Sequence, residues 1–533
     1  MGNEILRNEI PYLQHVEGET NLMVDGKPYL ILGGELHNSS GSSLSYLKEE
    51  VWPVLRQLGG NCYLTPVYWE CMEPEQGTYD FTLVDGVIEQ AREEGVRLVL
   101  LWFGLWKNGR STYAPSWIKE DPAYFYMRGQ DGRLVESVSP LCRPAVEADR
   151  KAFSALMEHL KEIDLERTVI MVQVENEVGI WGHPRDYSPE AETVFQQEIP
   201  EEMAELFSVR GSWEQAFGVK ACEYFMAWSL ARAVGEIAQA GKEAYPLPLF
   251  MNCVPDSMRM NGSKLAGGYP SGGPVPHVQD IWRKMAPAVD LYGPDIYDPN
   301  YQEISTEFAE KNALVVPELG GGKDAASKAL FTVAAFNTIC FSPFGIEGMM
   351  RPNSEQDLLS TMNIRQMPPL GRTGEYLAEA YRLLQVLWPE MKAAQKEERI
   401  WAFLQGQGRG EEFVLKDFVI NVGYGAGRPP MPGMPGSGRI AGEEEASAGG
   451  GFLIQYGEDE FFICGVSCQI DIKPRYGSQE QIFVREKREL LLTEEGFVAG
   501  RILNDDERNY LAFGSRPSVQ RVSFYRREEL TAK

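Results

Sequence analysis

Residues 169–177 read VIMVQVENE, an apolar run that ends abruptly in charged and amide side chains. The run predicts a β-strand, because hydrophobic residues fill it almost without interruption. Burying a carboxylate at the end of such a strand is costly unless the group is paired or functional. The strand end Glu175-Asn176-Glu177 is therefore the first place where chemistry is expected.

Seven further runs of this kind lie between about residues 28 and 390. With the first, the expected strands are Tyr29–Gly34, Cys62–Val67, Arg97–Phe103, Val169–Val174, Pro248–Val254, Leu291–Tyr297, Leu314–Glu318 and Cys340–Ile346. Segments of helical period alternate with them: Leu44–Leu58, Thr82–Glu94, Ala145–Ile163, Ala221–Ala244, Ala325–Thr338 and, closing the series, Gly374–Leu387. This alternation predicts an α/β fold, a parallel (β/α)8 TIM barrel rather than a doubly wound sheet.

The pattern changes to a period of two after about residue 395, which predicts an all-β sandwich. The expected strands are Ile400–Gln405, Glu412–Val422, Phe452–Tyr456, Glu460–Cys464, Gln469–Lys473, Gln481–Leu492 and Val522–Arg526. We therefore expect a catalytic barrel over residues 1–392 and an accessory sandwich over 393–533. A Gly/Pro-rich loop is expected at 423–451 inside the sandwich, because its composition cannot pack a core.

The composition excludes several classes of partner. The 533 residues carry a net charge of −26, which disfavours binding to nucleic acid and to anionic membrane surfaces. No apolar stretch approaches the roughly 20 residues that span a bilayer, and the polar N-terminus lacks a secretory signal. A cytoplasmic protein is expected, with a glycoside or oligosaccharide as its partner and a homo-oligomer left open.

The eight cysteines are scattered without paired spacing, and the chain has five histidines. Structural zinc and a histidine-rich metal site are therefore not expected, and neither is a cofactor. No phosphate-binding or dinucleotide-binding glycine pattern is present.

Two strand ends carry the carboxylates that suggest a reaction. In a barrel, catalytic residues lie where strands end, and Glu177 and Glu318 end strands four and seven. Such a pair suits retaining glycoside cleavage, in which one carboxyl donates a proton and the other attacks the anomeric carbon. Tyr297 ends strand six, within reach of Glu318. One carboxylate alone could equally be a solvated strand end, but the joint pattern argues against that interpretation.

These residues resemble a known family, glycoside hydrolase family 35, whose best-known members are β-galactosidases. The resemblance covers about residues 20–390 and rests on GGELH at 33–37, WECMEP at 69–74, GTYDF at 77–81, APSWI at 114–118 and QVENEVG at 173–179. It implies Glu177 as the acid/base, Asn176 as a contact to the sugar 2-hydroxyl and Glu318 as the nucleophile. It also implies exo-acting double displacement, and the C-terminal region resembles an accessory domain of a bacterial branch.

The sequence departs from the family where the sugar is read. Pro66 replaces a tyrosine that touches the sugar, Met72 replaces a histidine, and Phe103–Asn108 replaces an Ala-Glu-Trp segment. A β-galactosidase remains the expectation. The alternatives are a β-glucosidase or transglycosidase acting on short β-glucans and, in another class, a carbohydrate-binding barrel without catalysis.

Further substrate-binding candidates lie on or near the loops that follow the strands. They are Glu35, His37, Trp69, Trp106, Lys107, Asn108, Trp181, Trp282 and Glu347. An indole face can stack on a sugar ring, and the charged and amide groups can bond hydroxyls. Each tryptophan alone is more often a packing residue, and Glu35 and His37 could equally serve in a salt bridge or in the core.

Overall fold

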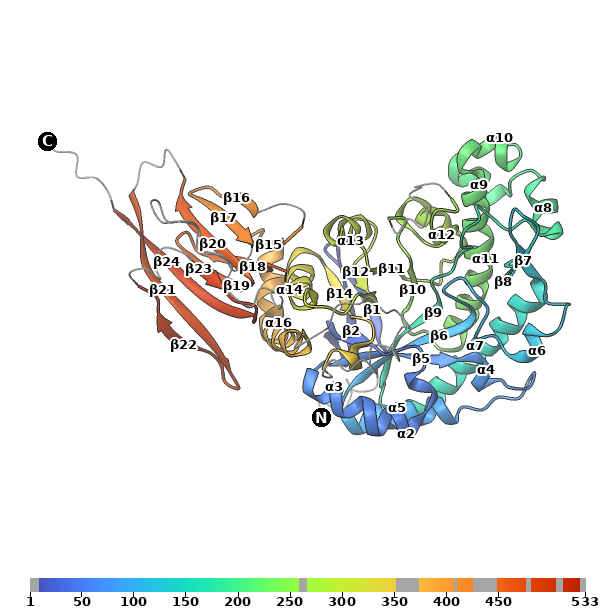
Figure 1. Ribbon diagram of the computed structural model, residues 1–533, viewed down its shortest axis with the longest axis horizontal. Coiled ribbons are helices and arrows are strands. Elements are labelled where there is room, and N and C mark those ends of the chain that lie inside the picture. Colours follow the sequence, from blue (N-terminus) through green and yellow to red (C-terminus); the bar gives the residue numbers. More distant parts are fainter. Residues whose placement is uncertain are drawn as a thin grey trace. The chain divides into compact units, whose positions relative to one another are not determined.

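The computed structural model describes residues 9–257, 266–350, 373–406, 410–424, 448–475, 481–504 and 511–527 (Figure 1). Its internal contacts divide the chain into two compact units. The first unit comprises residues 1–56, 60–320 and 337–346. The second comprises 57–59, 321–336 and 347–533.

The first unit contains the predicted parallel barrel. Its strands are β4 (Ile31–Glu35), β5 (Cys62–Tyr68), β6 (Arg97–Lys107), β9 (Val169–Asn176), β10 (Leu249–Cys253), β11 (Leu291–Ile296), β12 (Leu314–Val316), β13 (Glu318–Leu319) and β14 (Thr338–Phe341). They follow the order β12-β14-β4-β5-β6-β9-β10-β11-β13. Only Pro317, which has no N–H to donate, separates β12 from β13. Both ends of the sheet are thus parts of one strand, and the eight-stranded ring closes, which confirms the predicted fold.

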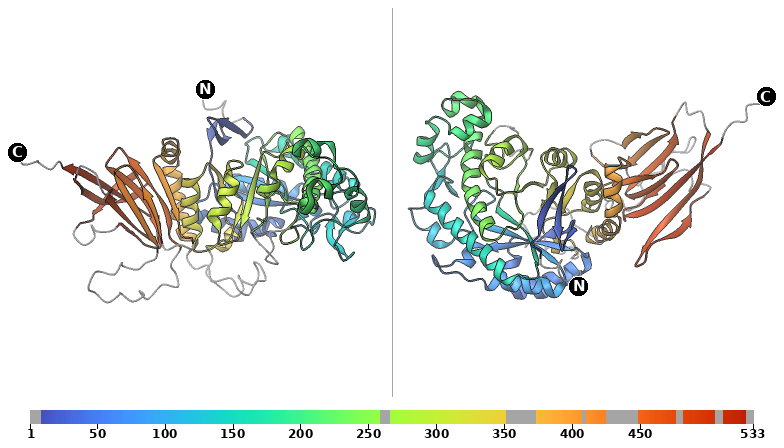
Figure 2. Two further views of the ribbon diagram at one scale, coloured as in Figure 1. Left: turned by 90° about the horizontal axis from the view of Figure 1, so that it is seen from above. Right: turned by 180° about the vertical axis from the view of Figure 1, so that it is seen from behind.

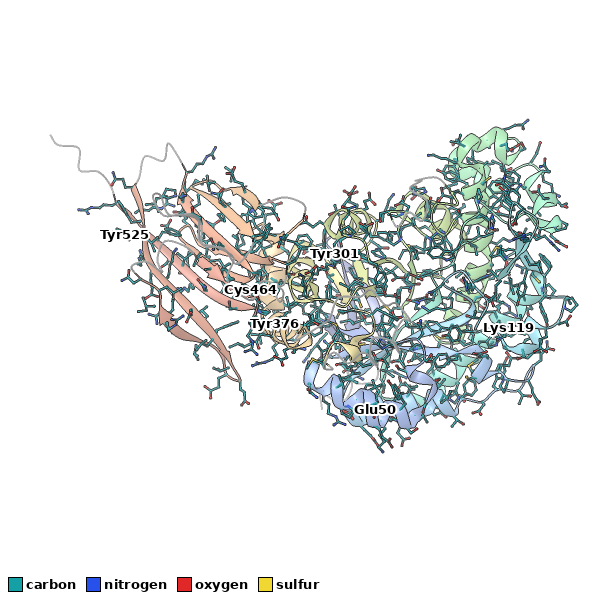
Figure 3. The ribbon with its side chains drawn as sticks, viewed as in Figure 1. Glu50, Lys119, Tyr301, Tyr376, Cys464 and Tyr525 are labelled. Atoms are coloured by element: carbon teal, nitrogen blue, oxygen red, sulfur yellow. The ribbon has the colours of Figure 1, made fainter. Side chains whose placement is uncertain are left out.

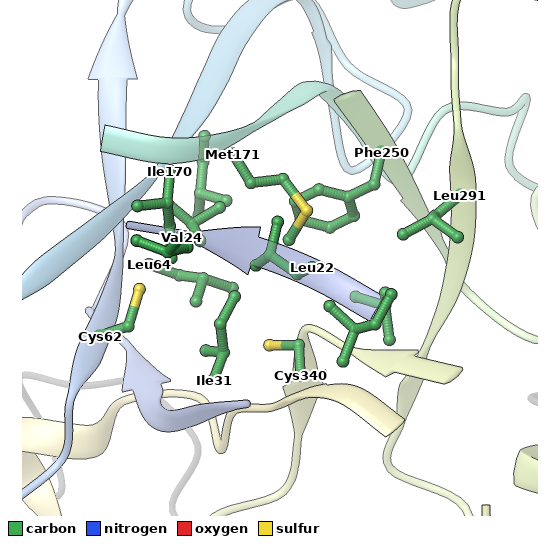
Figure 4. Packing of buried hydrophobic residues seen from close by; sticks show 14 of the residues in the cluster. Leu22, Val24, Ile31, Cys62, Leu64, Ile170, Met171, Phe250, Leu291 and Cys340 are labelled. Atoms are coloured by element: carbon green, nitrogen blue, oxygen red, sulfur yellow. The ribbon is translucent and has the colours of Figure 1, made fainter. Parts of the chain in front are cut away.

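A hairpin that the sequence pattern did not predict covers one end of the barrel. It consists of β1 (Tyr12–Val16), β2 (Glu19–Val24) and the short β3 (Lys27–Pro28). Leu22 and Val24 of β2 pack against residues at the beginnings of the barrel strands, such as Ile31 and Leu291 (Figure 4). Figure 2 shows the hairpin, in dark blue, at this end of the barrel. At the opposite end of the barrel, the strands finish and the loops that follow them begin.

Helices run between the strands in the expected alternation. The principal ones are α3 (Trp52–Leu58), α5 (Thr82–Glu94), α7 (Arg143–Ile163), α11 (Ala221–Ala244), α12 (Gln279–Met285) and α13 (Tyr301–Ala309). Shorter elements are α2 (Leu44–Tyr46), a π-helix at Leu47–Val51, α4 (Trp69–Met72), α6 (Ser116–Lys119), β7 (Tyr126–Arg128), β8 (Leu134–Val138), α8 (Pro189–Phe195), α9 (Glu201–Phe207) and α10 (Trp213–Phe217). Within the described part of the chain, no helix combines the length and the hydropathy needed to cross a bilayer.

The second unit confirms the predicted β-sandwich. One antiparallel sheet is formed by β15 (Ile400–Leu404), β18 (Gly450–Tyr456), β19 (Glu460–Val466), β24 (Ser518–Arg527), β21 (Gln481–Thr493) and β22 (Gly496–Ile502). The other is formed by β16 (Gly410–Val414), β17 (Phe418–Tyr424), β20 (Cys468–Pro474) and β23 (Leu511–Phe513). Phe418 and Ile420 of one sheet share a core with Phe461 and Phe524 of the other. Figure 3 shows the buried Cys464 among these strands.

Two helices and one expected loop complete the second unit. Helices α14 (Ala325–Ala335) and α16 (Thr373–Lys396) pack against each other there. Of the loop expected at 423–451, residues 425–447 lie outside the described residues. Its first two residues belong to β17, and its last two belong to β18.

The tight approach of β4 to β5 gives a test of the barrel. A Cβ atom added at Gly33 would lie 1.6 Å from the carbonyl oxygen of Cys62, which is fixed by strand pairing. We expect Gly33→Ala to lower the free energy of unfolding by about 1–3 kcal/mol or more, the usual cost of overpacking. Thermal and urea unfolding monitored by circular dichroism would measure it. Gly322→Ala is the control, because no atom lies within 4 Å of its added Cβ; equal effects of the two changes would contradict the prediction.

Candidate active site

Three buried carboxyl groups meet where the barrel strands end. Glu177 directly follows β9, Asp295 lies in β11 and Glu318 begins β13. The register of β11 and β13 pairs Asp295 directly with Glu318. One carboxylate oxygen from each of the three residues lies within 4.8 Å of those of the other two. None of the three side chains is more than 7% exposed, so their charges act on one another with little screening by water.

The backbone at the end of β9 is irregular, and this irregularity determines the direction of the side chains there. Glu175 and Glu177 have φ angles of 60° and 45°, in the left-handed region that residues other than glycine rarely adopt. Regular strand alternation therefore ends there. The backbone N–H of Glu177 donates to Oδ1 of Asn252 on β10 at 2.8 Å, which holds the strained position in place. Backbone strain of this kind, costing about 1–3 kcal/mol per residue, is concentrated at functional sites.

Glu175 supports the scaffold and is not one of the three clustered carboxyl groups. Its carboxylate accepts hydrogen bonds from the backbone N–H groups of Trp106, at 2.7 Å, and Leu105, at 3.3 Å. Asp149 of α7 accepts from the same Leu105 N–H at 2.8 Å. Burial raises the pKa of both acids, so the pair retains a proton and fixes the end of β6. Gly104 is required here, because an added Cβ would lie 2.6 Å from either carboxylate.

The fixed end of β6 places Lys107 among the carboxyl groups. Its side chain is buried, and its Nζ donates to Oδ1 of Asn176 at 2.9 Å. Burial lowers the pKa of Lys107, but nearby carboxyl groups, Glu318 first, outweigh this effect and raise the pKa above its usual value. The lysine is therefore a buried cation. Because its Oδ1 is taken, Asn176 keeps its Nδ2 for another acceptor, and among the described residues this buried atom has no partner.

Glu177 and Glu318 lie in contrasting environments. Burial and the charge of Glu318 raise the pKa of Glu177 to about 7, opposed by Lys107 and by a hydrogen bond with Asp295. Glu318 instead accepts a hydrogen bond from the Tyr297 hydroxyl at Oε1. Its Oε2 is buried, with no hydrogen-bond partner in the described part of the chain. Neighbouring carboxyl groups in contrasting environments can take different chemical roles.

Within the described residues, the three carboxyl groups are also the cluster whose oxygens lie close enough together to bind a metal ion. Lys107 lies beside them, however, and its ammonium group already supplies positive charge. The donor set is thus better explained by mutual electrostatics than by a metal centre.

The indole groups proposed from sequence differ in their surroundings. Trp69, Trp106 and Trp282 are fully buried. Their Nε1 atoms donate respectively to the Glu73 carboxylate and to the backbone carbonyls of Val138 and Gly272. Trp181 differs because it is only half-buried and its buried Nε1 has no partner among the described residues. Of these four indoles, Trp181 is the one with a ring surface and an N–H group available to a ligand.

The remaining four candidates occupy four different settings. Glu35 ends β4, is fully buried and contributes negative charge around Lys107. His37 packs edge-on against Phe344, with ring centroids 5.4 Å apart. Asn108 lies in an exposed turn with a φ of 52°. Glu347 belongs to the second unit, in a buried turn at Ile346–Gly348.

Sequence reasoning missed three buried polar residues that organise the site: Asp149, Asn252 and Asp295. A signal was present for two of them. Asn252 interrupts LFMNC and Asp295 interrupts LYGPDI, both apolar strand runs. Asp295 also precedes Tyr297 by two positions, so regular alternation would put both side chains on one face of the strand.

Two family models and two curated proteins match parts of the chain. Residues 21–230 match the model of glycosyl hydrolases family 35, and residues 377–514 match a domain of unknown function, DUF5597. A β-galactosidase of Xanthomonas manihotis is 29% identical over 171 residues, covering 32% of this chain and 27% of that protein. The human β-galactosidase-1-like protein 3 is 29% identical over 182 residues, covering 31% and 25%. The matched part thus spans about a quarter of the length of these curated relatives.

The solved structures that match the chain are more distant in sequence. A β-galactosidase from Rahnella has a TM-score of 0.46 at 14% identity, covering 68% of this chain and 57% of that one. The catalytic domain of a Paenibacillus polymyxa β-amylase has a TM-score of 0.46 at 12% identity, covering 64% and 100%.

The sequence match runs from β2 into α11 and includes the strained Glu175-Asn176-Glu177 segment. Residues 21–230, which form much of the barrel, are thus similar to glycosyl hydrolases family 35.

Proposed function

We propose that this protein is a retaining exo-β-glycosidase that removes a non-reducing-end sugar by double displacement, with a β-galactoside as its substrate. The observation that carries the proposal is the approach of Glu177 and Glu318, whose nearest carboxylate oxygens lie within 4.8 Å. Retaining enzymes keep their two carboxyl groups about 5–5.5 Å apart, whereas inverting enzymes need about 6.5–9.5 Å to admit a water. The short separation favours a direct nucleophile.

Glu177 is suited to the acid/base role. With a pKa of about 7 it is protonated in mildly acidic solution, so it can donate its proton to the leaving oxygen. It then remains as a carboxylate. In the second step this carboxylate takes a proton from the attacking water, which restores the acid.

Glu318 is suited to the nucleophilic role. Tyr297 occupies Oε1, which leaves Oε2 to form a bond with the anomeric carbon as the bond to the leaving oxygen breaks. Water then attacks the same carbon, and the Glu318 carboxylate is released. Two inversions return the β configuration. Glu318 lies outside the segment that matches the family model, so this assignment depends on geometry.

Asn176 completes the proposed sugar contact. The bond from Lys107 fixes the orientation of the amide, with Oδ1 occupied and the two N–H groups of Nδ2 left as donors. A hydroxyl on the carbon next to the anomeric centre is the acceptor that the family resemblance implies. Such bonds strengthen as charge develops on the ring in the transition state.

The identity of the sugar is argued from the relatives and from the residues near the site. The β-galactosidases among the relatives support a β-galactoside. A β-glucoside is the second candidate, because Pro66 offers no hydroxyl on β5 and the Lys107 amine is directed to Asn176. A panel of nitrophenyl β-glycosides and oligosaccharides, with products separated by chromatography, tests both. Turnover of none of them would contradict the proposed function.

The stereochemical course is the first prediction from the proposed function. Because Glu318 forms a covalent intermediate, the first product should be the β-anomer of the released sugar. Proton NMR of the anomeric signals, recorded in the first minutes before mutarotation, measures this. An initial α-anomer would show that water attacks directly and that Glu318 is a base.

The second prediction separates the two carboxylates. Glu318→Gln should abolish turnover of all substrates, since no intermediate can form. Glu177→Gln should slow substrates with poor leaving groups by roughly 10²–10⁴-fold and activated aryl glycosides much less in the first step. Azide should rescue the Glu177 variant and give a β-glycosyl azide, identified by NMR. Rescue of the Glu318 variant alone, with a β-glycosyl azide as the product, would reverse the roles.

The third prediction concerns pH. Activity needs protonated Glu177, so kcat/KM should fall as pH rises through about 7, and this basic limb should be absent in Glu177→Gln. Lys107→Met removes a positive charge that lowers the pKa of Glu177, so the limb should move to higher pH. Lys119→Met is the matched control, because this lysine lies at the end of α6 (Figure 3) and pairs with Glu70 of α4. A limb that stays in place in Lys107→Met would contradict the electrostatic assignment.

A further inference from the structure

Asp295 is a buried carboxyl group for which double displacement has no direct use. It is fully buried and is paired in register with Glu318. The reaction needs one acid and one nucleophile, and Glu177 and Glu318 fill those roles. A third carboxyl within 4.8 Å of both is costly to maintain unless it contributes something.

The contacts of Asp295 lead to Glu177. Asn252 donates from Nδ2 to Oδ2 of Asp295 at 2.6 Å, while its Oδ1 accepts from the backbone N–H of Glu177 at 2.8 Å. The Asn252 amide thus ties one oxygen of Asp295 to the backbone of Glu177. A carboxylate oxygen of Asp295 also lies within 4.8 Å of one of Glu177, and each carboxyl group shifts the pKa of the other.

A hydrogen bond between these two carboxyl groups requires a proton. No N–H or O–H donor within the described residues reaches Oδ1 of Asp295, although this atom is buried. Two ionised carboxylates have only acceptors, so one of the two groups must carry the hydrogen. Because Asn252 already donates to Oδ2, the arrangement leaves Oδ1 of Asp295 as the atom free to carry it.

The surrounding charges disfavour ionisation of Asp295. Glu318 and Cys253 face it from the neighbouring strands β13 and β10, and Tyr297 directly follows its own strand. Glu177, Glu35 and Lys107 also act on its charge, from strands further round the barrel. This set contains one positive charge, that of Lys107, and the carboxyl groups of three glutamates. An additional buried negative charge would therefore be repelled by more groups than attract it.

We propose that Asp295 is held as a neutral acid whose O–H donates to the Glu177 carboxyl, making it a positioning residue for the acid/base. The proposal rests on the proposed function for the role of Glu177. Burial, followed by the charges of Glu318 and Glu177, raises the pKa of Asp295 well above its usual value. The same hydrogen bond lowers the pKa of Glu177 and so limits how far burial raises it.

This arrangement serves both halves of the reaction without consuming the Asp295 proton. In the first step, Glu177 gives its own proton to the leaving oxygen. The resulting carboxylate is then stabilised by the O–H of Asp295, a charge-assisted hydrogen bond. In the second step, Glu177 takes a proton from water, and Asp295 ends each cycle with the hydrogen that it held at the start.

An infrared measurement tests the protonation directly and does not need a substrate. Spectra are recorded for the wild-type protein and for Asp295→Asn at a pH about two units above the pKa of Glu177, where Glu177 is ionised. We expect the difference spectrum to show the loss of one carbonyl band of a neutral carboxylic acid. The proton shared by Asp149 and Glu175 is present in both proteins and cancels. Absence of a lost band would overturn the proposal, whether or not the protein hydrolyses glycosides.

Kinetics test the positioning role. Asp295→Asn keeps a donor toward Glu177 and an acceptor toward Asn252, so kcat/KM should stay within about tenfold of wild type. Asp295→Ala loses the donor, so kcat/KM should fall by at least about tenfold and the basic limb should move to higher pH. Asp290→Asn is the matched control just before the opposite end of β11, where Asp290 pairs with Lys242, and should leave the limb in place.

The direction of the shift distinguishes the alternatives. If Asp295 were ionised, Asp295→Asn and Asp295→Ala would both remove a negative charge beside Glu177 and move the basic limb to lower pH. That result would overturn the proposal, as would an Ala variant whose rate and pH profile match the wild type. Thermal unfolding of each variant establishes that it is folded. If no glycoside is turned over at all, the proposed function fails, while the infrared band still decides the state of Asp295.

Discussion

One buried ammonium group among four buried carboxyl groups is the interaction on which the site depends. The positive charge of Lys107 attracts the carboxyl groups at the barrel mouth and offsets part of their mutual repulsion. Lys107 also orients Asn176. Its own position depends on the end of β6, which the Asp149–Glu175 pair holds through backbone N–H groups. A proton-sharing pair in the scaffold thus determines where the cation of the site lies. The geometry of the reacting groups follows from these buried charges, not from the loops alone.

The closed sheet provides the rigidity that such an arrangement needs. Strained φ angles at Glu175 and Glu177 persist only because the neighbouring strands fix the surrounding backbone, with Asn252 of β10 as the nearest support. Pro317 divides the seventh strand, so β13 pairs with β11 while β12 pairs with β14. The break lies one residue before Glu318, and each side of the strand is still held by a neighbour.

Sequence patterns predicted the barrel, the sandwich and the strands whose ends carry Glu177, Glu318 and Tyr297. Long apolar runs and their spacing can be recognised without knowledge of tertiary contacts. They did not reveal the hairpin of residues 12–28, whose short strands gain their stability from packing on the barrel end. Asp295 was missed because its partner Asn252 lies 43 positions away in the chain. The tryptophans illustrate the same limit, since nothing local shows that the Nε1 of Trp106 bonds to Val138.

The hairpin that packs Leu22 and Val24 into the beginnings of the strands leaves the reacting end as the way in and out of the barrel. A leaving group and the molecule that replaces it would then share one passage. In the proposed mechanism, water attacks the anomeric carbon after the aglycone has departed, so the two would use this end of the barrel in turn. Whatever refills that space first, a water molecule or the hydroxyl of a second sugar, determines whether the bond is hydrolysed or transferred. The ratio of hydrolysis to transfer would therefore depend on which molecule occupies the barrel mouth and not on the carboxyl groups.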